Sequence, residues 1–253
     1  MKDDFELIIH KLPTEQKSIN IYPLGDLHIG SQDFNMVHWT KWIDTVKADE
    51  NSRIVIVGDL VDNGLKNSKT NSYEATMRPR EQKEWLVQQL RPVKDKIIGA
   101  CMGNHEYRSV NDTDSCPLYD VMCKLDIEDL YRENMAFMKI NLGYRNKERQ
   151  HSYSMVLAHG GSRNKVTKFG YAVDGMDILV TGHTHSAESN FPAKIVIDTK
   201  NEIVKLVDYT HIVVPSFASY GGYALKGMYM PQGFKIPIIK ISGEKKEVKV
   251  EWI

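Results

Sequence analysis

The stretch RIVIVGD, residues 53–59, decides the fold class of this chain. Its apolar residues are almost wholly β-branched, and they run without interruption into a Gly-Asp pair. Such a run is typical of a strand that is buried on both faces of a sheet. Similar runs occur at residues 19–26 (INIYPLGD) and 97–104 (IIGACMGN). The first half of the chain is therefore predicted to supply three buried strands of an α/β fold.

Amphipathic helical patterns separate these runs. Each predicted helix begins with a residue suited to a helix start, namely Asn35 as a cap and Pro79 and Pro117 in first turns. The apolar residues at helical spacing are Met36, Trp39, Ile43 and Val46, then Leu86, Leu90 and Val93, then Leu118, Val121, Met122 and Leu125. These stripes are expected to pack into the core.

The second half of the chain changes character. SYSMVLAH (residues 152–159) and DILVTGH (residues 177–183) are predicted strands that end at histidines. The later runs AKIVID, EIVKLVDYTHIVV, KIPIIKI and EVKVEWI predict an antiparallel region of shorter strands. Because no repeat, low-complexity tract or linker interrupts the sequence, residues 1–253 are predicted to form one domain with strands between helix layers.

Bulk properties narrow the function classes. The formal net charge is +0, which gives no global electrostatic reason to expect nucleic-acid or membrane binding. A metal site can still supply local positive charge for a phosphate substrate. The three cysteines, Cys101, Cys116 and Cys123, form no CxxC pair, which favours free thiols in a reducing compartment. With no leader or membrane-spanning run expected, the protein is predicted to be cytoplasmic. The sequence carries no indication of an oligomeric state.

Polar residues with ligand chemistry directly follow five of the predicted strands. Functional groups in open α/β sheets gather outside the carboxyl ends of strands. In chain order the residues are Asp26 and His28, Asp59 and Asp62, Asn104 with His105 and Glu106, His159, and His183 with His185. Each one alone is more often an ordinary turn residue, but the ordered series is hard to obtain by chance. The series therefore predicts a single functional site.

This series, D-x-H, G-D-x-x-D, G-N-H-[DE], H and G-H-x-H, resembles the motifs of the calcineurin-like metallophosphoesterase superfamily. The matching residues run from about Gly25 to His185, and the C-terminal third lies outside the resemblance. The resemblance implies a four-layer α/β sandwich with two mixed β-sheets flanked by helices. It also implies a phosphoester hydrolase in which a hydroxide bridging two metal ions attacks phosphorus in line.

The resemblance also implies a metal-ligand role residue by residue. One ion would be held by Asp26, His28 and His185, and the other by Asn104, His159 and His183. Asp59 would bridge them, and its charge would offset part of the repulsion between two dications. The mixture of imidazole and oxygen ligands favours Mn²⁺, with Fe or Zn as alternatives.

His105 and Asp62 are the implied catalytic pair. His105 is not a ligand in this assignment and resembles the family's acid, which protonates the leaving-group oxygen or stabilises its charge. Asp62 is expected to accept the other imidazole N–H and to favour the charged form of His105. The alternative is that Asp62 only caps a turn.

The sequence departs from the serine/threonine phosphatases of the superfamily at Asn63. Those enzymes read GDxVDRG, and their arginine grips the substrate phosphate, whereas GDLVDNG offers an amide that cannot make a bidentate cationic contact. The glutamate of GNHE instead favours the phosphatases. We give the missing arginine more importance, because in those enzymes the arginine contacts the substrate. Asn63, Arg108 and Arg163 are the expected substrate contacts, since both arginines closely follow ligand motifs.

Three function classes remain open. A phosphodiesterase or nuclease acting on DNA, RNA or a nucleotide is favoured, and a phosphomonoesterase acting on a small molecule or protein is the alternative. A non-catalytic scaffold is least supported, because no ligand position is lost. Residues 216–234 mix glycines and tyrosines with Lys226, and they predict either a lip that stacks bases or an ordinary glycine-rich hairpin.

Overall fold

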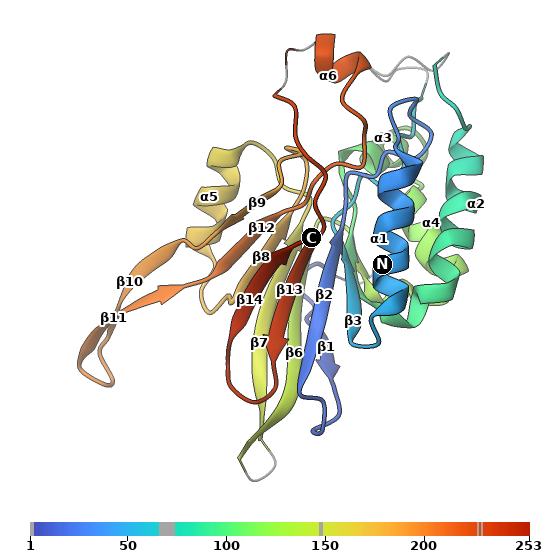
Figure 1. Cartoon of the computed structure of the whole chain (residues 1–253). Helices are drawn as coiled ribbons and strands as arrows, with labels where there is room; N and C mark the ends of the chain where they lie inside the picture. Colours follow the sequence, from blue (N-terminus) through green and yellow to red (C-terminus); the bar gives the residue numbers. More distant parts are fainter. Residues whose placement is uncertain (1–2, 66–73, 147–148, 227, 229) are drawn as a thin grey trace.

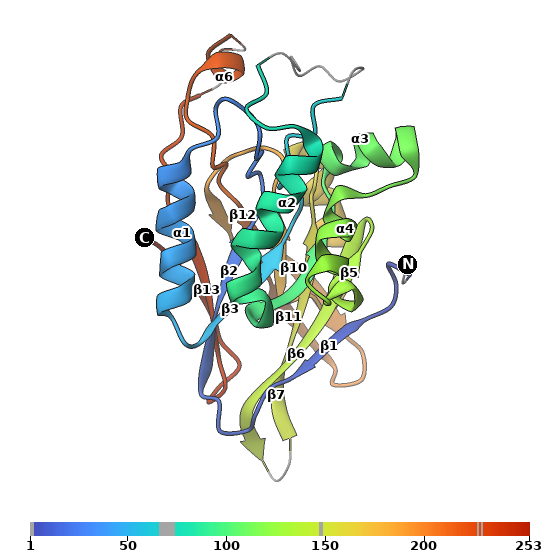
Figure 2. The same ribbon diagram turned by 90° about the vertical axis from the view of Figure 1, so that its right-hand side faces the viewer.

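The computed structural model describes residues 3–65, 74–146, 149–226, 228 and 230–253. The described strands include two six-stranded sheets. These sheets lie face to face around a shared core (Figures 1 and 2). The first sheet has the order β14 (Val248–Trp252), β13 (Pro237–Ser242), β2 (Ser18–Leu24), β3 (Ser52–Ile56), β4 (Ile97–Cys101), β5 (Tyr131–Arg132). The second has the order β1 (Ile8–Lys11), β6 (Met135–Asn146), β7 (Arg149–Ala158), β8 (Ile178–Thr181), β12 (Thr210–Val213), β9 (Glu188–Asn190).

Both sheets are mixed. Strands β2 to β5 are parallel, while β13 is antiparallel to β2 and β14. In the second sheet β7, β8 and β12 are parallel, and β6 and β9 run antiparallel to their neighbours β7 and β12. With helices packed on the outer faces, this architecture confirms the expected α/β fold with two mixed sheets.

Successive side chains of the central strands point to opposite faces of the sheet, and both faces are buried. This is why the sequences of these strands are uninterrupted apolar runs. In β2 and β3, Ile21 and Val55 point between the two sheets, whereas Leu24 and Ile56 point toward the helices. All four side chains are fully buried, because each face of the first sheet has its own core.

The three expected helices form and cover the outer face of the first sheet (Figure 2). They are α1 (Met36–Ala48), α2 (Pro79–Leu90) and α4 (Pro117–Lys124). The Asn35 side chain accepts hydrogen bonds from the backbone N–H groups of Val37 and His38, as a cap should. Val93 lies beyond α2, in the 3₁₀ helix η1 (Arg91–Lys96).

Four further short helices had no counterpart in the sequence prediction. They are α3 (Asn104–Thr113), η2 (Glu128–Leu130), α5 (Arg163–Ala172) and α6 (Gly222–Lys226). Glu106 is the one buried residue of α3, and α5 buries Val166 and Gly170, so neither carries a wide apolar stripe. Helix α5 packs on the outer face of the second sheet through Val166, against Val156 and Leu179.

The C-terminal region differs in part from the expected antiparallel strands. The run EIVKLVDYTHIVV breaks at the buried Tyr209 into β11 (Ile203–Asp208) and β12, and β12 pairs in parallel with β8. Strand β12 thereby joins the main sheet beside β8. Strands β10 (Ala193–Asp198) and β11 form a separate two-stranded sheet, which extends away from the body of the molecule in Figure 1. Strands β13 and β14 pair antiparallel, as predicted.

Candidate functional site

Loops from both sheets converge at the carboxyl ends of β2, β3, β4, β7 and β8. Backbone hydrogen bonds continue beyond the strand ends and tie neighbouring loops together. The N–H of Asp26 donates to the carbonyl oxygen of Gly58 at 3.1 Å, and the N–H of His28 donates to that of Asp59 at 3.0 Å. In the second sheet the N–H of Gly182 donates to the carbonyl oxygen of His159 at 2.9 Å. The five predicted strand ends therefore do contribute to one site.

The backbone of this site is unusual. Six of the predicted site residues have positive φ angles between 47° and 70°: Asp26, His28, Asp59, Asn63, His183 and His185. The left-handed region is costly for residues with a Cβ atom, and such conformations collect at functional sites. Glycines make the close approach of the loops feasible, since a Cβ on Gly58 would lie 2.0 Å from the nitrogen of Gly103.

One group of potential ligands consists of Asp26, His28 and His185. Their ligand atoms lie within 4.8 Å of one another. The Nε2 atoms of His28 and His185 are 3.1 Å apart, and Asp26 Oδ1 is 3.9 and 3.5 Å from them, respectively. Two imidazole nitrogens and a carboxylate oxygen that converge in this way suit a divalent transition-metal ion.

The second group centres on Asn104. Its Oδ1 atom lies 3.0 Å from Nε2 of His159 and 2.8 Å from Nδ1 of His183. Nδ1 of His159 lies 2.7 Å from the carbonyl oxygen of Val57. Such a contact orients an imidazole so that its other nitrogen faces a metal.

Asp59 lies between the two groups. Its Oδ2 atom is 3.2 Å from Nε2 of His159 and 3.9 Å from Nε2 of His105. It also forms potential metal-binding groups with Asp26 and His159 on one side and with His28 and His105 on the other. The position of this carboxylate fits a bridge between two cations, as the resemblance implied.

The electrostatics of these groups are strongly coupled. Burial alone raises the pKa of Asp59, but its hydrogen bond and charge interaction with His159 outweigh burial and hold that pKa well below the usual range. Burial lowers the pKa of His159, yet the same contact with Asp59 raises it to about 9. Burial drives the pKa of His28 well below its ordinary value. The site thus holds a buried carboxylate that is stabilised by positive charge, which is what divalent cations would supply.

His105 contacts Asp62 through the backbone of that residue. Its Nδ1 atom lies 2.7 Å from the backbone oxygen of Asp62, and 3.5 Å from the Asp62 carboxylate. The acceptor that faces Nδ1 of His105 is therefore the backbone carbonyl oxygen of Asp62, and the Asp62 carboxylate lies farther away. The Arg108 guanidinium lies 2.9 Å from Nε2 of His105 and donates to the same Asp62 carbonyl oxygen at 3.1 Å. Burial lowers the pKa of His105, whereas the charges of Asp59 and Asp62 act to raise it. Asp62 therefore favours the charged imidazole, as expected, but burial outweighs its effect.

The three predicted substrate contacts lie in different surroundings. Arg108 adjoins His105. Asn63 is only 1% exposed, and its amide donates to the carbonyl oxygen of His105 at 2.7 Å and to the Ser109 hydroxyl at 2.9 Å. Arg163 is exposed and forms an ion pair with Glu188. The geometry of Asn63 favours support of the His105 backbone over contact with substrate.

Glu106 organises the site in a way that the sequence reading missed. Its side chain is fully buried, and its carboxylate accepts hydrogen bonds from the backbone N–H groups of Asp59, Leu60 and Gly103 at 2.8, 2.8 and 2.9 Å. Burial, followed by the Asp59 charge, raises its pKa to about 6. Glu106 therefore fastens the loop after β3 to the loop after β4. The position of Glu106, two residues after the predicted ligand Asn104, was the feature of the sequence that could have indicated this role.

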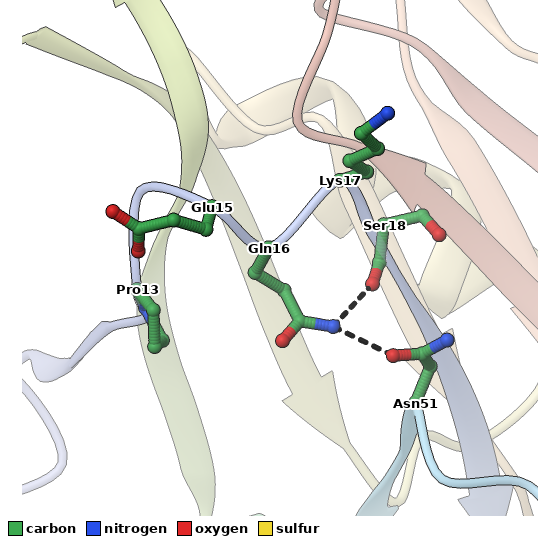
Figure 3. Close-up of a pocket in the computed structure, with 6 residues that line it drawn as sticks. All are labelled: Pro13, Glu15, Gln16, Lys17, Ser18 and Asn51. Atoms are coloured by element: carbon green, nitrogen blue, oxygen red, sulfur yellow. Dashed lines mark hydrogen bonds between the residues drawn. The ribbon is translucent and has the colours of Figure 1, made fainter.

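Two other regions contain none of the predicted ligands, although the N–H of Phe217 donates to the carbonyl oxygen of Asp26 at 3.1 Å. The pocket in Figure 3 has a volume of about 300 Å³ and lies at the start of β2, the strand end opposite the site. In that pocket the Gln16 amide donates to the Ser18 carbonyl and the Asn51 side chain. Among its described residues, the segment 216–234 contains α6 and no strand of the hairpin that was considered, while positions 227 and 229 lie outside the described residues.

Comparisons with known proteins complete this picture. No curated protein matches the chain in sequence. Among solved structures, Vps29 of Entamoeba histolytica, complexed with Zn²⁺, is 14% identical, with 93% of this chain and 98% of that chain covered and a TM-score of 0.42. A metallophosphoesterase of Sphaerobacter thermophilus is 13% identical, with 93% and 88% covered and a TM-score of 0.44. The calcineurin-like phosphoesterase YfkN of Bacillus subtilis is 12% identical, with 94% and 91% covered and a TM-score of 0.46.

Across the part of the chain that the structure describes, no helix combines the length and apolar character needed to cross a bilayer.

The family model for calcineurin-like phosphoesterases matches residues 19–187, which include every residue assigned to the site. This match covers more than half of the sequence, and it coincides with the strands and loops that bring the ligands together. The chain therefore belongs to the calcineurin-like phosphoesterase family and is a phosphoester hydrolase.

Proposed function

We propose that the protein is a two-metal phosphodiesterase that acts on nucleic acid or on nucleotides. The observation that carries this proposal is the inward-facing amide at Asn63, where the serine/threonine phosphatases place an arginine. A phosphate monoester carries up to two negative charges near neutral pH, whereas a diester carries one. A site without that cationic fork is better matched to the singly charged diester.

Seven residues are proposed to hold the two ions. Asp26, His28 and His185 form one set, Asn104, His159 and His183 form the other, and Asp59 bridges them. When bound, two such ions supply hydroxide near neutral pH and neutralise phosphoryl oxygens. The mixed nitrogen and oxygen ligands favour Mn²⁺, with Fe and Zn as alternatives.

The proposed catalytic acid is His105, with Asp62 and Arg108 as its partners. The contact of Nδ1 with the Asp62 carbonyl leaves Nε2 facing Asp59 and the guanidinium of Arg108. A phosphate oxygen that attracts Arg108 would free Nε2 to hold the proton destined for the leaving-group oxygen. Arg108 is accordingly proposed as the substrate contact nearest the acid, and Arg163 as a more distant one.

One observation favours the second candidate, a phosphomonoesterase. Arg108 places one guanidinium beside His105, and this cation could serve a dianionic phosphate in place of the missing arginine. A comparison of ester types separates the two candidates.

The test measures Mn²⁺-dependent turnover of bis-p-nitrophenyl phosphate and p-nitrophenyl phosphate on one preparation. The proposal expects faster turnover of the diester, together with cleavage of labelled single-stranded or double-stranded DNA. A preference for the monoester by orders of magnitude would identify a phosphomonoesterase. Absence of turnover with either ester, despite bound metal, would favour a binding scaffold. The Asp59→Asn variant is the control for contaminating hydrolases.

We also propose a cytoplasmic location. Cys101, Cys116 and Cys123 are all free in the structure, and two of them are buried. Free thiols are the usual state in a reducing compartment. Fractionation of cells that produce the protein would test this assignment.

A further inference from the structure

The β10–β11 hairpin has its more apolar face exposed. In the ladder, Ile195 pairs with Leu206 and Ile197 pairs with Val204, so these four side chains lie in two adjacent rows on one face. They are 72%, 73%, 73% and 68% exposed in that order. The opposite face carries Lys194 and Asp198 and is less exposed, which reverses the usual pattern of a half-buried sheet.

The charged groups of the opposite face are already paired within the chain. Lys194 forms an ion pair with Asp174, and Lys205 binds Asp198 at 3.1 Å. The two central rows of the exposed face contain no charged residue. The next row on this face pairs Ala193 with the exposed Asp208, so the face has a charge only at the base of the hairpin. The chemistry of the two central rows fits another apolar surface.

The size of the face suits a contact between two copies. Together the four side chains present on the order of 500 Å² of apolar surface, near the top of the range of about 300–600 Å² for the largest patch on a monomer. Two such faces in contact would bury about 1,000 Å², which is the lower limit of a specific interface. Phe191, two residues before β10, is also 61% exposed. The chain has a formal net charge of +0, so long-range repulsion would not oppose the approach of a second copy.

We propose that the exposed face of the hairpin packs on the same face of a second copy of the chain. A two-fold axis that crosses the strands places the tip of each hairpin over the base of the other. Ile195 of one copy then lies over Ile197 of the other, and Leu206 lies over Val204. Pairing of the two copies through this face does not depend on the substrate of the enzyme.

The geometry explains why the hairpin can stand apart from the two main sheets. Among the described residues, neither β10 nor β11 pairs with a third strand. An isolated two-stranded hairpin is marginally stable in water, and packing against a second layer is the usual remedy. A second hairpin at the spacing of about 10 Å between packed sheets would provide that layer.

Sedimentation velocity over about 1–100 µM, the range of moderate affinities, tests the proposal on the full chain. We expect a species of twice the 29.0 kDa monomer mass, whose population rises with concentration. Ile195→Lys alone and Ile197→Glu alone should each leave monomers, because a charge would be buried against an isoleucine. An equimolar mixture should recover dimers, since the lysine of one copy would then face the glutamate of the other.

The matched control is the Leu225→Ser/Met228→Ser variant, which removes two exposed apolar side chains from another surface. This variant should dimerise like the parent protein. Circular dichroism and thermal unfolding would check that the hairpin variants remain folded, as expected for substitutions of exposed residues. A parent chain that stays monomeric throughout, or dimers that survive both single substitutions, would overturn the proposal. Binding of a monomer to phosphatidylcholine vesicles would assign the face to a lipid surface and would overturn it as well.

Discussion

At the scale of single residues, His105 can be separated experimentally from the metal ligands. Its Nε2 atom lies beside Asp59 and Arg108, while its Nδ1 atom is held by the Asp62 carbonyl. We expect His105→Asn to lower kcat by about 10²–10⁴-fold, the usual contribution of general acid catalysis, with the metal content unchanged. Metal analysis and turnover of one preparation measure both quantities. Loss of metal from this variant would make His105 a ligand instead.

Asp59→Asn should have the reverse effect. Asp59 participates in two of the potential metal-binding groups, so loss of its charge weakens the attraction for both ions. We expect both sites to lose metal on dialysis against a weak chelator, with turnover falling in proportion. Asp62→Asn is the matched control, because Asp62 belongs to none of these groups among the described residues. Equal metal retention by the two variants would rule out the bridging role.

His159 makes metal affinity depend on pH. Its pKa is raised to about 9 in the metal-free protein, so at pH 7 a proton occupies a position that a metal would need. Affinity should therefore rise by about tenfold per pH unit between pH 7 and 9, the slope for release of one proton, and then level off. Calorimetry in buffers with different ionisation enthalpies would count the released protons. A pH-independent affinity over this interval would contradict the proposed coordination by His159.

The same pair links pH to the stability of the metal-free fold. Because the folded-state pKa of His159 is raised from 6.5 to about 9, the stabilising contribution of its protonated form is complete below pH 6.5. It is lost as the pH rises through about 9. The contribution of His159 to the stability of the metal-free protein should accordingly decrease between pH 6.5 and about pH 9.

The residues at the site could be predicted because metal ligands are restricted to a few residue types, which can be recognised in the sequence. Asp26, Asp59 and His185 each follow an apolar strand within a few positions, and strand ends meet at one edge. Hydrogen-bond partners could not be predicted in the same way. Whether the carbonyl or the carboxylate of Asp62 holds His105 depends on the left-handed turn of the loop that ends at Asn63, which no spacing reveals.

At the scale of elements, the connection between the loops after β3 and β4 depends on Glu106. Its carboxylate serves backbone N–H groups of both loops, and an amide has only one oxygen to accept them. We expect Glu106→Gln to lower the free energy of unfolding by about 2–4 kcal/mol, through unsatisfied buried donors, and to weaken metal binding by displacing Asp59.

The control for this prediction is Glu84→Gln. Glu84 pairs with Arg80 on an exposed face of α2, where an ion pair contributes at most about 1 kcal/mol. Thermal unfolding and metal titration of both variants would test the assignment. If Glu106→Gln is as stable as the parent and keeps its metal affinity, the carboxylate is not needed to align the loops.

Elements with strong periodicity were predictable, and those defined by the site were not. Helices α1, α2 and α4 present apolar stripes to a core, so their positions follow from sequence. Helix α3 begins inside a ligand motif, at Asn104, and buries little more than Glu106, so its residues read as a turn. Strand β12 was expected in an antiparallel region, and it pairs antiparallel with β9 but parallel with β8. The parallel pairing was not predictable, because strand partners depend on tertiary contacts and not on local pattern.

At the scale of the whole molecule, we propose that the two sheets unfold together as one domain. Ile21 and Val55 of the first sheet share a core with Tyr153 and Ile178 of the second. Ile21→Ala should destabilise the protein by about 2–5 kcal/mol, as expected for a buried isoleucine. Far-UV and near-UV circular dichroism should still report one transition. Ile9→Ala, at a position that is 54% exposed, is the control. Two separate transitions would indicate that the sheets are independent units.

The positive φ angles of the six site residues restrict the substitutions that the protein can accept. Besides glycine, the residue types that tolerate this backbone region best are asparagine, aspartate and histidine, and these are the types found there. The same three types supply amide, carboxylate and imidazole ligands. A library of variants that keep both the backbone conformation and metal binding therefore needs only a few residue types at these positions. Most single-nucleotide changes there should be eliminated in a selection for function.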